Sequence, residues 1–395
     1  MRKVFFIIML LGAFPGMREV CAQGIGSVLE SVEANNLSLR AHADLTKAQS
    51  IGARVGNSLG NPDVEYNRNW GSPARLGVEN ELTVVQEFDF PAAYFIRGKL
   101  AKLKDRQFLY EHSTIRQQIL LEAKTLCIGI VAGRRLRAIA RQRLANASRL
   151  CEVYARKLET GEGTILEKNK VEMEKVAAAN ELNMVNIELE AALNRLKTLN
   201  GGQDVVFPDS VYTETARLAP LEEMIARYEQ YDPTLLASGA RRESAGQAVK
   251  ASRAEILPKL EVGYKHEFSP GEKFHGMIVG MNVPVFAGRR ELKQAKAEEV
   301  YARTQYESDL NDVRTALTAM YARAEVLAGS LAEYSRMAGD THQYQAYLDK
   351  ALNAGQISVV DYFTEIATIY EVQESEIHFD RDYRLAEAQI NAIDL

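Results

Sequence analysis

The sequence contains few of the residues that interrupt or cross-link helices. Its 395 residues include 10 prolines, 3 cysteines and a single tryptophan. This composition favours long helices over many small β modules. Cys127 and Cys151 lie 24 positions apart within one predicted helix, which is roughly 36 Å at the helical rise. A disulfide bond between them is excluded if that helix is continuous.

Long apolar runs are also missing beyond the amino terminus, where no stretch approaches 18 consecutive apolar residues. Such a chain is either soluble or enters a membrane as a barrel of tilted strands, each about 9–11 residues long. Residues 1–22 predict a cleaved secretory signal peptide, with Arg2 and Lys3 before a short apolar segment and cleavage after Ala22. The alternative is acylation of Cys21, although two charged residues directly before it are atypical of a lipoprotein.

Motifs for catalysis and nucleotide binding are absent. The sequence has no G-x-x-x-x-G-K-[ST], no G-x-G-x-x-G after a strand, no H-E-x-x-H and no G-x-S-x-G. Without the signal peptide the formal charge is −7, from 45 basic and 52 acidic residues, which argues against a nucleic-acid partner. His266 and His275 could approach each other across a hairpin, but loop histidines are more often solvated than metal-bound. We therefore expect no enzyme activity, no cofactor and no metal site.

What the sequence does contain is one order of predicted elements that occurs twice. The first occurrence comprises a helix, two strands and a helical hairpin, at residues 24–57, 61–70, 81–90 and 92–199. The second comprises the same elements at residues 217–254, 258–268, 275–284 and 289–393. We therefore divide the mature chain into a first repeat, 23–202, a linker, 203–216, and a second repeat, 217–395.

Four landmarks keep the two repeats in register. The pairs are Asn36 with Asp232 and Pro62 with Pro258, each 196 positions apart, Pro91 with Pro284, 193 apart, and Gly161 with Gly355, 194 apart. The first proline-free helical segment, from about residue 92 to 158, would be on the order of 100 Å long. Two long hairpins in register therefore dominate the predicted molecule.

Four strands are too few to close a barrel, since small barrels need about eight. A strand pair is not stable alone, and its open edges need partners. Identical chains are the available partners, and three of them would supply twelve strands. Apolar residues on more than one face of the long helices suit helices flanked on both sides in a cylindrical wall.

Several motifs in this order resemble the TolC family of outer-membrane efflux proteins over nearly the whole mature chain. Residues 283–289 read V-P-V-F-x-G-R, which is similar to the strand-to-helix signature of the family, and 232–235 read D-P-x-L, which is similar to a helix start. The two turns K-L-x-x-G at 157–161 and L-x-x-G-x-x-S-x-x-D at 352–361 resemble the paired tip turns of the family.

This resemblance implies a mainly α fold with a small membrane β part. Two tandem repeats would contribute four strands per chain to a twelve-stranded barrel of a homotrimer, continued by a twelve-helix periplasmic tunnel. It also implies a passive exit duct in the outer-membrane lipid, joined through a periplasmic adaptor to an inner-membrane pump of the RND, ABC or MFS type.

The resemblance also implies roles for particular residues. The tip turns that would contact the adaptor contain Lys157, Leu158, Gly161, Leu352, Gly355 and Ser358. Acidic residues near the tip are candidates for the closed aperture or gate: Asp361, Glu365 and Glu167. For Glu167, a first-turn acid stabilised by the helix dipole is an equally suitable explanation. The strand-to-helix junctions contain Pro91, Pro284, Gly288 and Arg289.

The expected function is export of drugs or metal cations through the outer membrane. An outer-membrane duct for a type I protein or peptide secretion system is an alternative. A periplasmic coiled-coil scaffold or adaptor without a barrel is another, but adaptors usually carry one hairpin instead of two in register. A basic run on the first long helix, from Arg134 to Arg143, predicts salt bridges to a neighbouring helix or a cation-repelling tunnel lining.

Overall fold

A computed structural model describes residues 24–73, 75, 77–212, 218–269, 271–284 and 288–395. The predicted signal peptide with Cys21 lies outside the described residues, as do residues 213–216 of the linker and Val285 and Phe286 of the junction motif. The elements in chain order are α1 Ile25–Asn35, α2 Leu37–Gly52, β1 Asp63–Trp70, β2 Val78–Phe88, α3 Pro91–Glu159, α4 Ile165–Leu199, α5 Leu221–Tyr231, α6 Pro233–Ala254, β3 Lys259–Ser269, β4 Glu272–Asn282, α7 Arg289–Asn353, α8 Val359–Ile390 and the 3-10 turn η2 Ala392–Asp394.

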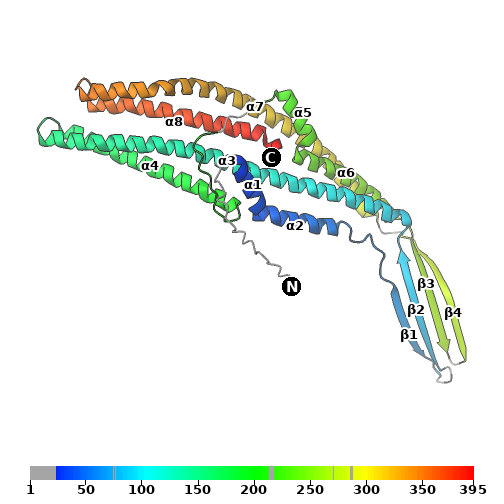
Figure 1. Cartoon of the computed structure of the whole chain (residues 1–395). Helices are drawn as coiled ribbons and strands as arrows, with labels where there is room; N and C mark the ends of the chain where they lie inside the picture. Colours follow the sequence, from blue (N-terminus) through cyan, green and yellow to red (C-terminus); the bar gives the residue numbers. More distant parts are fainter. Residues whose placement is uncertain (1–23, 74, 76, 213–217, 270, 285–287) are drawn as a thin grey trace, which may run out of the picture.

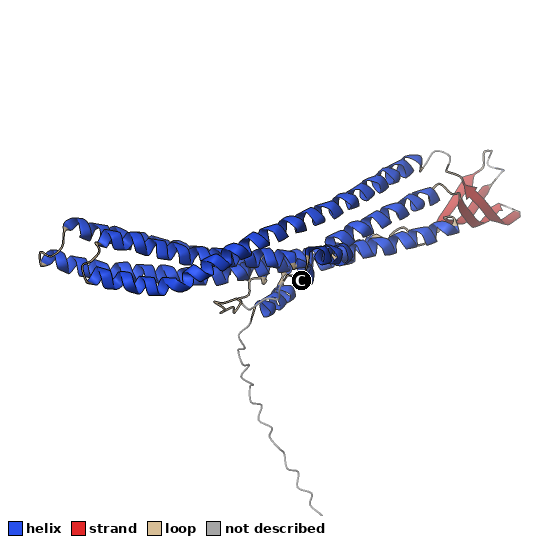
Figure 2. Cartoon of the chain, turned by 90° about the horizontal axis from the view of Figure 1, so that it is seen from above, coloured by secondary structure: helices blue, strands red, loops and turns tan. Residues whose placement is uncertain are grey.

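The molecule is long and has its strands at one end. Two helical hairpins, α3 with α4 and α7 with α8, lie side by side, and the sheet extends from the far ends of α3 and α7 (Figure 1). The view from above again places the strands at one end and the hairpin turns at the other (Figure 2). The 69 residues of α3 correspond to about 100 Å. None of the described helices is both long and apolar enough to cross a membrane.

The prediction of one continuous helix before each strand pair is wrong in both repeats. Asn36 separates α1 from α2, and Asp232 separates α5 from α6. Both residues adopt extended backbone, and their side chains accept hydrogen bonds from the backbone N–H of Leu39 and Leu235, at 2.8 and 3.0 Å. An amide or carboxylate that caps a helix start in this way ends the preceding helix, which periodicity alone does not show.

One antiparallel sheet joins the two repeats, with strand order β1-β2-β3-β4. The central pairing places Val84 of β2 opposite Tyr264 of β3. Strands β1 and β4 are the two edges of the sheet. Among the described strands, β1 pairs only with β2 and β4 pairs only with β3. The fourth strand was predicted to begin at residue 275, three residues too late. Strand β4 begins at Glu272, because the turn after Ser269 is tighter than predicted. Phe90 precedes α3 as its N-cap and does not share a strand face with Phe88.

Apolar packing occurs between helices, in three clusters along the length of the molecule. One cluster lies near the hairpin turns and includes Leu150, Val171 and Tyr362. The second joins α1 to the first hairpin, and the third joins α5 to the second hairpin. Cys127 is fully buried in the second cluster, where burial raises the pKa of its thiol to about 12. Burial therefore keeps this thiol protonated and unreactive.

Candidate functional site

One face of the sheet is mostly apolar. Because side chains alternate along a strand, the register brings together every second residue of each strand. The apolar members of this face are Val64, Tyr66, Trp70, Val78, Leu82, Val84, Phe88, Leu260, Val262, Tyr264, Phe268, Met277, Val279 and Met281. Several are highly exposed, including Met277 at 80%, Val279 at 78% and Trp70 at 74%. An exposed apolar face of this size marks a surface that contacts lipid or another protein.

The opposite face of the sheet is acidic. Every Asp and Glu of the four strands lies on it: Asp63, Glu65, Glu79, Glu81, Glu87, Glu261, Glu267 and Glu272. Two cations share this face and form ion pairs there. Lys259 Nζ lies 2.7 Å from Glu87, and Lys265 Nζ lies 3.1 Å from Glu81. The sheet therefore separates an apolar surface from a charged, water-compatible one.

The predicted junction residues lie where strands lead into helices. Pro91 is the first residue of α3, a position that needs no backbone N–H. Pro284 follows the end of β4, and Arg289 begins α7. Gly288 caps α7 with a φ of 82°, and a Cβ there would lie 2.7 Å from Ile256 Cγ1. Glycine is thus required at this junction by both backbone conformation and space.

The two hairpin turns share three equivalent backbone hydrogen bonds, donated by Thr160, Gly161 and Glu162 in the first and by Ala354, Gly355 and Gln356 in the second. The carbonyl of Lys157 accepts from the N–H of Glu162 at 2.8 Å, and the carbonyl of Ala351, 194 positions later, accepts from Gln356 at 2.9 Å. Gly161 and Gly355 adopt φ of 78° and 69°, as this way of ending a helix requires. The side chains of the two turns differ, so the turns share their backbone conformation and not their sequence.

Among the predicted tip residues, Leu352 is buried in the cluster near the turns, with 6% of its surface exposed. Leu158 and Lys157 are half-buried. Ser358 is the N-cap of α8, and its hydroxyl accepts a hydrogen bond from the N–H of Asp361 at 3.1 Å.

Two of the three gate candidates act as helix caps. Glu167 accepts from the N–H of Thr164 at 2.8 Å, and Asp361 accepts from the Ser358 hydroxyl at 2.7 Å, so both belong to capping boxes. The backbone and side-chain hydrogen bonds from Thr164 lower the pKa of Glu167. Each of these two acids therefore has a structural role at the start of a helix.

The third candidate, Glu365, accepts a hydrogen bond from the hydroxyl of Tyr344 at 2.8 Å. This bond links α8 to α7 within the second hairpin and raises the pKa of Tyr344. Glu365 is thus held by its own hairpin and is not brought together with Glu167 by a described contact.

Ion pairs connect helices along the first long helix, as the basic run predicted for two of its arginines. Arg135 of α3 lies 2.6 Å from Glu376 and 2.6 Å from Asp380, both on α8. Burial lowers the pKa of Arg135, but these two carboxylates outweigh it and raise the pKa overall. Arg143 pairs with Glu181 of α4 at 2.6 Å. Arg135 therefore links the two hairpins, and Arg143 links the arms of the first.

An apolar stripe on α4 was missed by the sequence reasoning. Five apolar side chains on this helix are 57–77% exposed: Leu166, Met173, Val176, Met184 and Ile187. Their spacing of seven, three, eight and three residues places them along one side of the helix. The same periodicity is readable in the sequence, so the signal was present. A stripe without a partner in the described chain indicates packing against another molecule.

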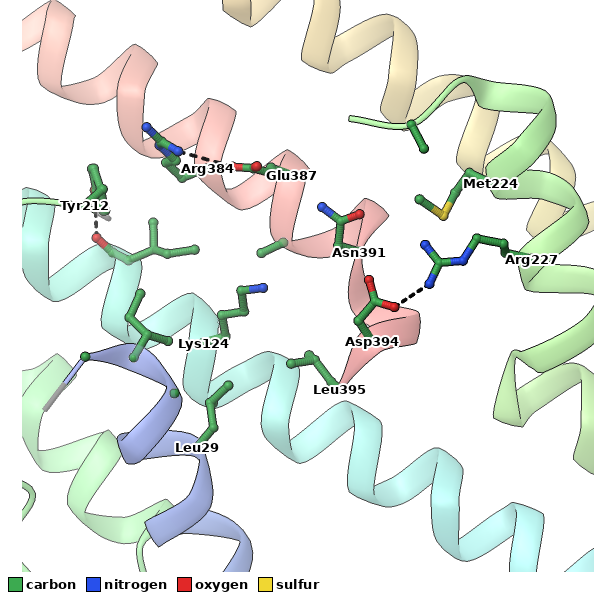
Figure 3. Close-up of a pocket in the computed structure, with 16 residues that line it drawn as sticks. Leu29, Lys124, Tyr212, Met224, Arg227, Arg384, Glu387, Asn391, Asp394 and Leu395 are labelled. Carbon is green, nitrogen blue, oxygen red and sulfur yellow. Dashed lines mark hydrogen bonds and ion pairs between the residues drawn. The ribbon is translucent and has the colours of Figure 1, made fainter. Parts of the chain in front are cut away.

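A cavity of about 680 Å³ lies where α1, α3, α5 and the end of α8 converge (Figure 3). Arg384 and Glu387 approach each other there at 3.5 Å, and Arg227 forms an ion pair with Asp394 across the cavity mouth. The described lining contains no Ser, Cys or His.

Histidines and carboxylates do not gather into a metal centre among the residues that the structure describes. His266 and His275 are directly opposite each other in the β3–β4 register, with ring centroids 6.4 Å apart. The predicted approach across the hairpin is thus confirmed, without a third ligand from the described chain.

Comparison with known proteins shows which class of protein this chain resembles. Residues 224–394 match the family model described as outer membrane efflux protein. Similar solved structures include CusC, with 13% identity, a TM-score of 0.78 and coverage of 94% of this chain and 92% of that chain. A membrane protein from Pseudomonas aeruginosa has 17% identity and a TM-score of 0.79 over 93% and 89%, and VceC from Vibrio cholerae has 14% and 0.76 over 93% and 95%. No curated protein sequence matches.

The chain therefore has the fold of TolC-like outer-membrane channels such as CusC and VceC. At these identities the similarity to solved structures establishes the fold. The resemblance to the TolC family of outer-membrane efflux proteins that the motifs predicted is confirmed, with the family model covering most of the second repeat.

Proposed function

We propose that this chain is one subunit of a trimeric exit duct in the outer membrane of a tripartite efflux system. The observation that carries the proposal is the sheet: an exposed apolar face, an acidic face behind it and two unpaired edges, at the end of two helices that are each about 100 Å long. In this arrangement the apolar face contacts lipid, the acidic face lines water, and the hairpins extend into the periplasm after removal of residues 1–22.

An assembly of three copies would pair the open strand edges and cover the exposed apolar stripe of α4. Strand β1 of one copy can pair with β4 of the next, which closes twelve strands and leaves no edge exposed. The apolar stripe of α4 gains a partner in the same assembly, since neighbouring hairpins stand side by side in a twelve-helix wall. The repeats 23–202 and 217–395 have the same order of elements with equivalent caps and turns, which suits such a nearly regular wall.

Transport through this duct requires no chemistry from the chain itself. An inner-membrane pump supplies the energy, and a periplasmic adaptor contacts the two hairpin turns. Because Gly161 and Gly355 close equivalent turns, both hairpins offer the adaptor the same backbone shape. Glu167 and Asp361, at the starts of α4 and α8, would contribute to a narrow acidic aperture near the same end.

The first test concerns assembly. The protein should require detergent for extraction and migrate on a gel as a trimer that dissociates on heating. A soluble monomer would contradict the barrel, because the exposed apolar face would then be in water.

The second test concerns the tips. Substitution of Leu158 and Gly161 together, and separately of Leu352 and Gly355, should abolish resistance to the exported drug or metal while heat-dissociable trimers persist. Lys168→Gln is a matched control, since its ion pair with Glu172 is exposed and contributes little to stability. Full resistance in both tip variants would reject the tip assignment while leaving the channel intact.

A further inference from the structure

The two faces of the sheet differ in whether their Lys and Arg side chains form ion pairs. On the acidic face, Lys259 and Lys265 form ion pairs with carboxylates of neighbouring strands. On the apolar face, Arg68 and Lys273 are exposed, and no carboxylate of the described chain lies within ion-pair distance of either. The strands contain no Asp or Glu on this apolar face. Arg68 and Lys273 therefore lack an anionic partner within the described chain.

These two cations lie in a single row across the sheet. The register runs from Arg68 to Asn80, then to Phe268 and to Lys273. The row is close to the end of the strands farthest from the helices, with the loop that follows Trp70 beyond it. The next row inward contains Tyr66, Leu82, His266 and His275.

The remaining rows, toward the helices, are apolar apart from Gln86. They extend from the Tyr264 row to the row of Phe88, Leu260 and Met281. Eight residues of strand separate that last row from the cationic one, roughly 26 Å along the strand and about 20 Å along the normal of a barrel with tilted strands. This height is close to the apolar band of outer-membrane barrels. The cations therefore lie at one boundary of the band.

Aromatic and hydrogen-bonding side chains accompany the cations at that boundary. The guanidinium of Arg68 lies 5.8 Å from the centroid of the Trp70 ring, and the hydroxyl of Tyr66 donates to Asn80 at 2.8 Å. Aromatic residues with a polar edge are typical of the level of lipid headgroups. Unpaired Arg and Lys at the same level attract anionic headgroups.

We propose that Arg68 and Lys273 bind the phosphate groups of an anionic lipid in the leaflet at the outer end of the strands. The inference rests on the proposed insertion of the sheet into the outer membrane. Acyl chains of the lipid lie on the apolar rows, and its phosphates meet the cationic row. A protein partner would instead require carboxylates at this height and a polar surface below it, whereas the rows below are apolar.

The experiment uses the full-length protein, purified as a trimer in detergent, and native mass spectrometry to count bound lipid. The probes are bis-phosphorylated lipid A and the same acylated disaccharide with both phosphates removed. Wild type should bind the phosphorylated probe at least tenfold more tightly, because each cation contributes a charge-assisted hydrogen bond. The variant R68Q/K273Q should lose that preference and keep the affinity for the dephosphorylated probe.

Two controls make the result specific. The variant R68K/K273R keeps both charges and should retain the preference, whereas K259Q/K265Q removes the same net charge from the acidic face and should also retain it. Equal preference in R68Q/K273Q and wild type would overturn the lipid proposal while the channel assignment stands. Failure of the wild type to form detergent-dependent trimers would instead remove the channel assignment and the lipid proposal together.

Discussion

Replacement of Arg135 tests what joins the two hairpins. Its guanidinium lies 2.6 Å from each of two carboxylates on α8, and the side chains of Arg135, Glu376 and Asp380 are 27%, 18% and 13% exposed. Arg135→Met would leave two acids one helical turn apart with Arg384 near only one of them, at 3.4 Å from Asp380. Removing one partner from a largely buried ion pair costs about 3–5 kcal/mol.

The assay is the temperature at which purified trimers dissociate and unfold, followed by gel migration and circular dichroism. For a chain of this length, that loss corresponds to a decrease in Tm of about 5 °C. Arg149→Met is the matched control, because its contact with Asp349 is 3.4 Å long and the two side chains are 49% and 34% exposed. That variant should change stability by less than about 1 kcal/mol.

A rescue variant separates the charge effect from lost packing. Neutralising both acids in the Arg135→Met background, with Glu376→Gln and Asp380→Asn, should recover most of the lost stability. If Arg135→Met melts at the same temperature as Arg149→Met, the ion-pair argument is refuted.

Three further predictions concern other parts of the chain. Burial, and next the proximity of Glu181, raise the pKa of Glu374 to about 7. Because the pKa of Glu374 is raised in the folded protein, its carboxyl group does not destabilise the fold below about pH 4.5, where it is protonated in both the folded and the unfolded chain. The protein loses stability as the pH rises through 7 and this buried group has to become charged. Glu374→Gln should thus stabilise the protein by about 1–2 kcal/mol at pH 8, discounted for half exposure, and by nothing at pH 4; equal melting temperatures at pH 8 would contradict the assignment. Asn36→Ala should cost about 2–3 kcal/mol in denaturant unfolding, because both the cap of α2 and the 2.8 Å bond to the carbonyl of Leu199 are lost; a change below 0.5 kcal/mol would show that water replaces them. Gly201→Ala should be far more destabilising than Gly202→Ala in the same assay, although both have positive φ, since only the first would place a Cβ 2.4 Å from a backbone oxygen, that of Asn35; equal effects would mean that the backbone shifts without cost.

The elements with long periodic patterns were predicted well from the sequence. The short-range breaks were not placed, although the D-P-x-L motif at 232–235 resembled a helix start and α6 does begin there. Four strands, two very long helices and the glycine turns at Gly161 and Gly355 follow from periodicity and from the positions of proline and glycine. The breaks at Asn36 and Asp232 depend on a single side chain that bonds to a backbone N–H three residues later. Hydrophobic periodicity does not distinguish such a cap from a polar residue on the outside of a continuous helix.

The chemistry of the site was predictable in part. Strand alternation identified apolar faces within single strands, but the grouping of all strand carboxylates on one face depends on the pairing register between β1, β2, β3 and β4. That register is set by contacts between distant parts of the chain, which one sequence does not reveal. The capping roles of Glu167 and Asp361 were readable from their spacing to Thr164 and Ser358, since each acid follows the hydroxyl residue by three positions.

The open edges of β1 and β4 have a genetic consequence. If each ring needs three intact edges, a variant with Pro in the middle of β4 would enter mixed rings and spoil them. With equal amounts of variant and normal chain, random mixing would leave about one ring in eight built only from normal chains. Such an allele would be dominant, because the fraction of fully normal rings equals the third power of the fraction of normal chain.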